Sequence, residues 1–573
     1  MSNKNHHRYL SETRLCLNRE IFDWCLTQSQ QSLLLQEFEK SMQWCLTTAG
    51  IAAAIGCNQL VSIELEELLL KIAKILPVPV VINKPIHENS CQRWLHVMSK
   101  AYVSGGHTAL VTRWIKNAPS NERHSLVLTF DENLSVEKLS HAVSGTGGTI
   151  TALGSAGTFI ERANSLRTIA WHEADIVVLH IHMHDVIPTV AFGIKNGPPV
   201  MLVNHADHTF WVGASIADRV INIRKSGENF TKLFRGVSRN TQLPIPIPDD
   251  QEHSEIFKQT IRSETRTALN IPLSATVLLT IGTGFKYNPI GNIDFLSAIL
   301  KVFKSTPDIY LVAIGPSSEN PLWKNASDLT NCHIIALGQQ SDLWKYHQVA
   351  DIYVEGFPFG SLTALLEAAI SGLPCVRAPK ICPAPFVSDG ISIDIIKAPN
   401  DIEAYMSTIT HLIQNPIDRN ELGIKLQASV KNYHCSDSWL CYLSDVNKNL
   451  EKHEIYQLDL IQTLDKKTND FLVQLLHTIN KKDTISLLLE SLKLAKLHPN
   501  FDFRISKILF SISKEDSDCN INNKNMFLLW ILTSLFKVPA QTLLNGKRNK
   551  LCIFQNVLTY YYGRFIGWRF QHV

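Results

Sequence analysis

The chain has 573 residues, of which 45% are hydrophobic and 19% are charged, and its formal net charge is only +3. A chain of this length folds as about two to four domains, and the balance of apolar and charged residues excludes a disordered protein. The small net charge gives no support to a function that binds nucleic acid. The 12 cysteines form no CxxC pair or regular framework, so we expect reduced thiols and a cytoplasmic location.

Neither end of the chain has a typical membrane-targeting pattern. The start, MSNKNHHRYLSETR, lacks the apolar core of a signal sequence, and the longest apolar run, at 526–536, is too short to span a bilayer. The tail from Lys547 is basic and aromatic and could lie on a membrane surface, but a buried terminal helix is the preferred prediction. Membrane association is therefore not expected. The pattern carries no information on the oligomeric state.

Four regions follow one another along the chain. Residues 1–90 repeat apolar residues at three- and four-residue steps and predict helices. Residues 91–243 and 250–440 alternate short β-rich runs with helical stretches, which predicts two parallel sheets with crossover helices. The stretch LPIPIPDDQEH at 243–253 is predicted to be a linker, and residues 441–573 predict helices again. The predicted fold class is α/β, with two Rossmann-like domains facing across a cleft and helical regions at both ends.

One stretch, EGFPFGSLTALLEAAISGLPCV at 355–376, predicts a strand end, a turn and a helix with Ser361 as its N-cap. The free N–H groups at such a helix start form an anion site that suits a diphosphate. Glu367 lies roughly 9 Å further along the helix axis and would reach the hydroxyls of an attached ribose. A buried strand, turn and helix with a solvated Glu367 accounts for the pattern equally well. The residues predicted to bind the donor here are Gly360, Ser361, Leu362, Thr363 and Glu367.

Together with HIIALGQQSDLWKYHQVA before it, this stretch resembles the donor-binding segment of Leloir glycosyltransferases with the GT-B fold, of the group 1 type, which bind UDP with an inward Glu. The resemblance covers residues 96–440. Retaining members carry a second Glu eight positions before the ribose-binding one, and Phe359 stands there in this chain. The FPFG element is similar to that of the inverting cytoplasmic glucosyltransferases that modify bacterial adhesins, so the resemblance favours inversion.

A second Gly-containing turn follows the predicted strand TVLLTIG. By the same resemblance its Lys286 would neutralise the diphosphate leaving group, as a point charge. Gly282 and Gly284 begin a GxGxxG pattern, but Tyr287 stands at the third Gly position, which argues against a dinucleotide site.

Two further loops are assigned from position. Gln339 and Gln340 would contact the nucleotide base, as their position in the segment that resembles the glycosyltransferases implies. The alternative is a surface loop that contacts no ligand. The Gly-rich SGTGGTITALGSAG at 144–157 lacks the Lys-Ser/Thr of a Walker motif and is predicted to be a mobile loop near the cleft.

Histidines gather where strands of the amino half end. VSGGHTALVTRW predicts a tight Gly turn and a helix that starts near His107. The alternative to a functional role is that His107 only makes hydrogen bonds at the start of this helix. HIHMHDVIP at 180–188 predicts three His on one strand face, and NHADHTFW at 204–211 follows the next strand. Such spacing can bind a metal, but the superfamily works without one and none is predicted. The predicted general bases are His205, Asp207 and His107, and the predicted acceptor contacts are His184 and Asp185.

These residues predict a glycosyltransferase that transfers a hexose from a UDP-sugar to a saccharide or protein acceptor. Its partners would be the nucleotide-sugar donor and the glycan or protein acceptor, with no cofactor beyond the UDP-sugar co-substrate. The resemblance implies a role in bacterial cell-surface glycan synthesis or protein glycosylation. Two alternatives stay open. An epimerase or hydrolase on the same fold would release UDP without an acceptor, and a non-catalytic partner subunit would bind the nucleotide sugar without turnover.

Overall fold

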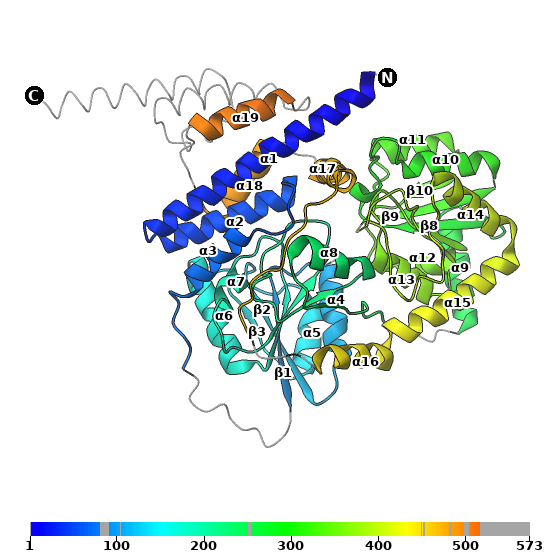
Figure 1. Ribbon diagram of the computed structural model, residues 1–573. Helices are drawn as coiled ribbons and strands as arrows, with labels where there is room; N and C mark the ends of the chain where they lie inside the picture. The colour runs from blue at the N-terminus through cyan, green and yellow to red at the C-terminus, as the bar shows by residue number, and fades with distance from the viewer. Residues whose placement is uncertain are drawn as a thin grey trace, which may run out of the picture. The chain divides into compact units, whose positions relative to one another are not determined.

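The chain divides into two compact units, one formed by Met1–Asn58 with Asn480–Val573 and the other by Gln59–Ile479; Figure 1 shows the helices and strands of both. The computed structural model describes residues 2–80, 91–103, 105–249, 254–306, 308–384, 386–448, 450, 453–480, 484–497 and 503–515. The predicted apolar run at 526–536 and the tail from Lys547 lie outside these residues.

The described part of the first unit is helical. Its helices are α1 (Ser2–Leu34), α2 (Phe38–Ile55), α18 (Thr484–Leu494) and α19 (Phe503–Glu515). Helices α1 and α2 meet through Trp24 and Trp44, whose rings stack edge to face with centroids 5.2 Å apart. Asn18 fixes the end of α2 because its amide donates to the carbonyls of Ile55 and Gly56. The helices predicted for the start of the chain are therefore confirmed for α1 and α2.

The second unit begins with α3 (Ile63–Ala73), which is fixed by the buried Glu66. The Glu66 carboxylate accepts hydrogen bonds from the backbone N–H groups of Gly213, Ala214 and Ser215, and from the Ser215 hydroxyl. These bonds satisfy a buried carboxylate that would otherwise be costly. Helix α3 thus belongs to the sheet-containing unit.

The amino-terminal sheet of this unit has seven strands in the order β3-β2-β1-β4-β5-β6-β7, and all neighbouring pairs run parallel. Its strands are β1 (Gln92–Met98), β2 (Glu122–Leu128), β3 (Ile150–Ala152), β4 (Ile176–His180), β5 (Val200–Asn204), β6 (Arg219–Asn222) and β7 (Asn240–Gln242). Its helices are α4 (Gly106–Lys116), α5 (Glu137–Gly145), α6 (Phe159–Glu173), α7 (Ile187–Ala191) and α8 (Lys225–Arg235). The order reverses between β1 and β4, which is the switch point where doubly wound sheets bind ligands.

The carboxyl-terminal sheet has five parallel strands in the order β10-β9-β8-β11-β12. Its strands are β8 (Thr276–Ile281), β9 (Ile309–Ile314), β10 (Ile334–Ala336), β11 (Ile352–Val354) and β12 (Cys375–Val376). The helices around it are α9 (Glu255–Ala268), the short 3-10 helix η1 (Gly284–Tyr287), α10 (Phe295–Ser305), α11 (Pro321–Leu329), α12 (Trp344–Val349), α13 (Leu362–Ile370), α14 (Ile402–Gln414), α15 (Pro416–His434) and α17 (Lys466–Asn480). Helix α16 (Ser436–Asn447) instead contacts the amino-terminal domain, where Trp439 packs on Trp114. The order again reverses, between β8 and β11. The predicted fold class of two Rossmann-like domains with helical additions is confirmed.

Two local predictions are wrong. The stretch at 144–157 contains the edge strand β3, which pairs with β2, so it is no mobile loop near the site. Gly148 explains the packing, because a Cβ there would lie 1.8 Å from the carbonyl oxygen of His124. The three histidines of 180–188 do not share a strand face either. Strand β4 ends at His180, and the following residues turn away from the sheet.

The Pro-rich segment between the two domains is buried where it is described. Leu243, Ile245 and Ile247 are at most 2% exposed and belong to one apolar cluster that contains residues of both sheets. The segment also contacts α16, because the ring N–H of Trp439 in that helix donates a hydrogen bond to the carbonyl of Pro244. The Pro residues prevent regular structure, yet the alternating Ile side chains pack into the core. The predicted domain boundary at residue 440 falls inside α16.

Candidate functional site

The turn from β11 to α13 has the predicted form. Helix α13 begins at Leu362 with Ser361 as its N-cap residue, but the Ser361 side chain makes no capping hydrogen bond. Its hydroxyl instead accepts a hydrogen bond from Lys286 Nζ at 3.1 Å. Gly360 is required because a Cβ at this position would lie 2.4 Å from the buried Glu355 Oε1. The first N–H groups of α13 are therefore available to an anion without competition from the Ser361 side chain.

Lys286 lies beside this turn as predicted. It comes from η1, directly after β8, and its Nζ also donates to the Gly360 carbonyl at 3.3 Å. The same Nζ lies 4.7 Å from the centre of the Phe359 ring. Burial, and secondly the charge of Arg224, lowers the pKa of Lys286 to about 8. A bound anion would offset both effects, so the site is prepared for negative charge.

The first domain adds a second cation to this place. Arg224 is the residue before α8, its side chain is 8% exposed, and its Nε lies 3.9 Å from Asp207 Oδ2. Burial alone would raise the pKa of Asp207, but the Arg224 charge, a hydrogen bond from His208 and the Arg235 charge hold that pKa below its usual range. Asp207 is therefore ionised and positions Arg224 close to Lys286. This pairing does not suit the predicted role of Asp207 as a general base.

Glu367, the predicted ribose ligand, lies in an ion pair between the domains. Arg113 Nη2 in α4 donates to Glu367 Oε1, and the two side chains are 20% and 17% exposed. The starts of α4 and α13 also meet, since a Cβ at Gly106 would lie 3.5 Å from the Thr363 hydroxyl oxygen. Two helix N-termini, each with its partial positive charge, thus converge beside two buried cations.

His107 lies in the first turn of α4, next to this convergence. Its ring donates to the carbonyl of His180, while its Nε2 is buried and has no hydrogen-bond partner. The ring stands edge-on to His205, with centroids 4.3 Å apart. Burial lowers the pKa of His107 to about 4, against the opposing effect of the His180 carbonyl. The ring is therefore neutral near pH 7, and its Nε2 lone pair can accept a proton.

His205 follows β5 and is also neutral. Burial and the neighbouring imidazoles of His107 and His182 lower its pKa well below the ordinary range. Its Nε2 lies 3.2 Å from His180 Nδ1. A small cavity of about 20 Å³ borders His205 and His182, which is room for about one water molecule. The structure thus brings two of the three predicted bases into contact.

The predicted acceptor contacts differ in exposure. His184 is partly exposed and lies 6.4 Å from the Phe130 ring, centre to centre. Asp185 is fully buried and accepts hydrogen bonds from Ser99, Thr129 and the backbone N–H of Ile187. Burial raises its pKa to about 6, although these hydrogen bonds oppose the shift. Asp185 therefore holds the loop after β4 together and presents no surface to an acceptor.

The two glutamines after β10 are placed differently from each other. Gln339 is exposed. Gln340 is held in its own loop, since its amide donates to the Leu337 carbonyl and its Oε1 accepts from Tyr346 Oη. Only Gln339 is free of these local bonds and remains available for contact with a nucleotide base.

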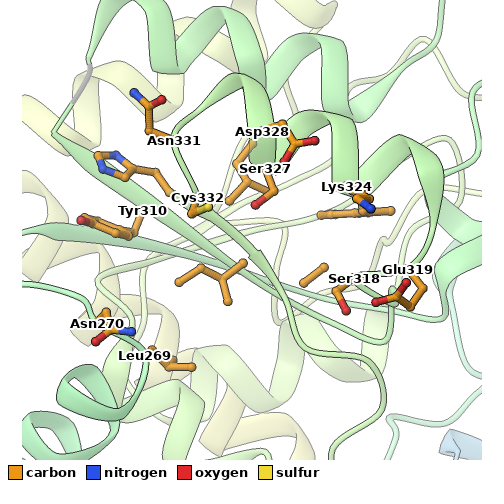
Figure 2. Close-up of a pocket in the computed structure, with 15 residues that line it drawn as sticks. Leu269, Asn270, Tyr310, Ser318, Glu319, Lys324, Ser327, Asp328, Asn331 and Cys332 are labelled. Atoms are coloured by element: carbon orange, nitrogen blue, oxygen red, sulfur yellow. The ribbon is translucent and has the colours of Figure 1, made fainter.

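A separate hollow lies at the edge strand β10. Figure 2 shows this pocket of about 560 Å³, with Tyr310 and Asn270 at one end and Lys324 and Glu319 at the other. None of the predicted site residues lines it. The hollow is therefore not part of the site at the switch points.

Metal and membrane features were searched over the described part of the chain. There, no group of three or more His, Cys, Asp or Glu side chains is arranged to hold a metal ion. Within the same residues, no helix combines the length and the apolar character that crossing a bilayer requires.

Arg113 and Arg224 of the site were missed from the sequence, and so were two buried histidines of the amino-terminal sheet, His96 and His124. The two arginines carry no local signal, because only the packing of distant segments brings them to the site. His96 does carry one, since it is a polar residue inside the apolar half of the strand QRWLHVM. His124 carries little, because Glu122, Arg123 and Ser125 around it are also polar.

Comparison with known proteins gives one family match. Residues 275–415 match the model described as "Glycosyl transferases group 1". None of the curated proteins matches the sequence. The match includes Lys286, the turn at Gly360 and Glu367.

Three solved structures illustrate the structural similarity. A glycosyltransferase from Rickettsia africae is 13% identical with a TM-score of 0.48, covering 62% of this chain and 99% of its own. HepE from Anabaena, in complex with UDP and glucose, is 12% identical with a TM-score of 0.46, covering 62% and 98%. An O-GlcNAc transferase variant from Thermobaculum terrenum is 12% identical with a TM-score of 0.46, covering 77% and 84%.

The expected resemblance to group 1 enzymes is confirmed for the carboxyl-terminal domain, while the similarity of the FPFG turn to adhesin glucosyltransferases stays a prediction. Over residues 275–415 the chain is thus similar to the group 1 glycosyltransferases, and this similarity supports a glycosyltransferase.

Proposed function

We propose that this protein transfers a hexose from a UDP-sugar to a hydroxyl or amide of a saccharide or protein acceptor. The main observation in support of this proposal is that the N-termini of α4 and α13 lie together with Lys286 and Arg224. A nucleoside diphosphate is a polyanion, and such a convergence of N–H groups and cations is the environment that stabilises it.

The donor would lie across the switch point of the second sheet. Its diphosphate would contact the N–H groups of Ser361, Leu362 and Thr363 together with Lys286. Glu367 would accept a hydrogen bond from the ribose. Because a carboxylate accepts several hydrogen bonds, Glu367 can hold Arg113 and a ribose hydroxyl at the same time. Gln339 would contact the base.

The chemical step would use the neutral histidines. The acceptor oxygen or nitrogen forms a bond to the anomeric carbon while the bond from that carbon to the diphosphate oxygen breaks. The proton of the acceptor goes to a ring nitrogen of His205, with His107 beside it, and UDP leaves with its new charge held by Lys286. Leaving-group stabilisation and positioning would supply most of the acceleration. Phe359, in place of a second Glu, favours inversion at the anomeric carbon.

The first test is ligand binding measured by thermal unfolding with UDP, GDP, ADP and NAD. A ligand at about 100 times its Kd stabilises the folded state by roughly 2.7 kcal/mol, so UDP should raise the Tm and the other nucleotides should not. Glu367→Ala should remove most of this shift, and the Tm of the free variant is its own reference because the loss of the Arg113 ion pair also lowers stability. Glu403→Ala, at an exposed position of α14, is the matched control. An unchanged UDP shift in Glu367→Ala would refute the ribose role.

Release of UDP from UDP-sugars then separates the alternatives. A glycosyltransferase releases UDP faster when an acceptor is present. Equal release with and without acceptor would indicate a hydrolase, and conversion of the sugar without release would indicate an epimerase. Binding with no turnover at all would establish a non-catalytic partner subunit.

A further inference from the structure

A row of hydrogen-bonded histidines crosses the amino-terminal sheet. His205 Nε2 lies 3.2 Å from His180 Nδ1, His180 Nε2 lies 3.1 Å from His96 Nδ1, and His96 Nε2 lies 2.9 Å from His124 Nδ1. The row ends where His124 Nε2 lies 3.0 Å from Glu122 Oε2. We call these five residues the histidine chain. Each ring presents its Nε2 to the Nδ1 of the next, so the chain has a direction.

The order of the strands in the sheet brings the residues of the histidine chain together. The strands that carry or precede its members are neighbours in the sheet, in the order β2, β1, β4 and β5. The parallel register sets Met98 opposite His180 and Leu126 opposite His96, so successive histidines are offset along the strands. The histidine chain therefore runs from the first residue of β2, Glu122, across β1 and β4 to the end of β5, where His205 meets His107.

The three central rings are sealed from solvent. His96, His124 and His180 are 0% exposed. Trp94 stacks on the His124 ring at 5.6 Å, and Trp114 stands edge-on to His96 and His180 at 5.7 Å each. A charged imidazole in such apolar surroundings is strongly disfavoured. His96 and His180 are therefore neutral, each with one N–H and one lone pair. At the far end, the Glu122 side chain is 13% exposed.

Glu122, at the end of the histidine chain, determines which nitrogen of each ring carries the proton. A carboxylate only accepts hydrogen bonds, so His124 must carry its proton on Nε2 to donate to Glu122. Where His124 Nδ1 accepts the hydrogen bond from His96 Nε2, the proton of His96 lies on Nε2, and the same reasoning applies to His180. His205 must in turn donate from Nε2. Its Nδ1 is left as a lone pair.

We propose that Glu122 acts through His124, His96 and His180 as a positioning group that fixes His205 as the Nε2–H tautomer, with Nδ1 free to take the acceptor's proton. When Nδ1 takes this proton, His205 becomes an imidazolium whose Nε2–H still donates to His180. The polarised chain ending in the carboxylate stabilises that charge. Tautomer control and charge stabilisation by a hydrogen-bonded carboxylate are known to govern histidine bases. The catalytic consequence, though not the tautomer assignment, rests on the proposed glycosyl transfer.

The tautomers can be measured without any substrate. Protein labelled with ¹⁵N-histidine gives separate NMR signals for protonated and unprotonated ring nitrogens, and single variants of each chain histidine assign them. We expect all four rings to be protonated on Nε2. In Glu122→Gln the amide can donate as well as accept, so Nδ1–H signals should appear for the chain, including His205. Glu137→Gln, at an exposed position of α5 beside His141, should leave the signals of the histidine chain unchanged. Nδ1–H at His205 in the unmodified protein, or an unchanged spectrum in Glu122→Gln, would overturn the proposal.

Measurement of kcat gives an independent test of the proposal. In Glu122→Gln, kcat should fall by about 10- to 100-fold, less than the roughly 10²- to 10⁴-fold loss from removing a general base, while the Kd for UDP stays unchanged. His96→Leu should have the same effect by breaking the chain in its middle. If His96→Leu does not fold, Glu122→Gln at the partly exposed end still decides. Absence of glycosyl transfer in the unmodified protein, with the expected tautomers present, would refute the proposed function and leave the histidine chain standing. The expected spectral change with unaltered kcat would refute the catalytic part.

Discussion

The lowered pKa of Lys286 predicts that affinity for UDP depends on pH. Only the protonated amine attracts the diphosphate, and its pKa is about 8 in the free protein. At pH 7 about nine-tenths of this amine is protonated and at pH 9 about one-tenth, so the Kd for UDP should rise about tenfold, equivalent to about 1.4 kcal/mol. The affinity is thus retained below pH 8 and is lost as pH rises above it.

The other groups around Lys286 do not produce this profile. The pKa of Asp207 is held low, and the pKa of His208 is lowered, with burial as the main cause. The phosphates of UDP are ionised above about pH 6. The dependence should therefore come from Lys286.

Isothermal titration calorimetry with UDP at pH 7, 8 and 9 measures the effect. Lys286→Arg keeps a permanent charge and should bind UDP with little change in Kd over this range. Lys286→Met should bind more weakly and also lose the pH dependence. A flat profile in the unmodified protein, or an equal slope in Lys286→Arg, would refute the assignment of the diphosphate to Lys286.

Two further predictions concern the junction of the domains and the turn before α13. Arg113→Met should raise the Kd for UDP several-fold because Glu367 loses the partner that orients it; calorimetry measures this, and tighter binding would instead mean that Arg113 competes with the ribose. Gly360→Ala should lower the free energy of unfolding in urea by about 1–3 kcal/mol, because its Cβ would overlap Glu355 Oε1. Gly145→Ala, where no atom lies within 4 Å of the added Cβ, should be close to neutral, and equal stability of the two variants would contradict the steric argument.

Much of the fold was legible in the sequence. Apolar runs such as TVLLTI and IVVLH became central strands, because the two-sided burial of a parallel sheet demands such runs. Strands β3 and β7 were missed because each has only three residues, all partly exposed, and so lacks an apolar signature. The Pro-rich segment connects the two sheets and has no regular structure over its described residues 243–249, as predicted for a linker. Its burial was missed because prolines indicate only the absence of regular structure.

The site was legible only where its residues are close in sequence. The turn at Gly360 and Ser361 sets its own geometry, and Lys286 follows a strand end, so both could be placed from local pattern. Arg113 is separated from Glu367 by 254 positions, and only the packing of the two domains brings them together. The histidine chain depends on strand order, which a single sequence does not display.

The position of Arg224 changes the roles that were expected for the two domains. The amino-terminal domain was expected to hold the acceptor and the carboxyl-terminal domain the donor. Yet Arg224 belongs to the first domain and lies close enough to Lys286 for its charge to lower the pKa of that lysine. Two like charges held near each other repel. Asp207 offsets the charge of Arg224 from 3.9 Å, and a bound anion would stabilise the two cations further. The diphosphate would therefore join the two domains, and its departure as UDP would leave two cations that repel each other across the junction.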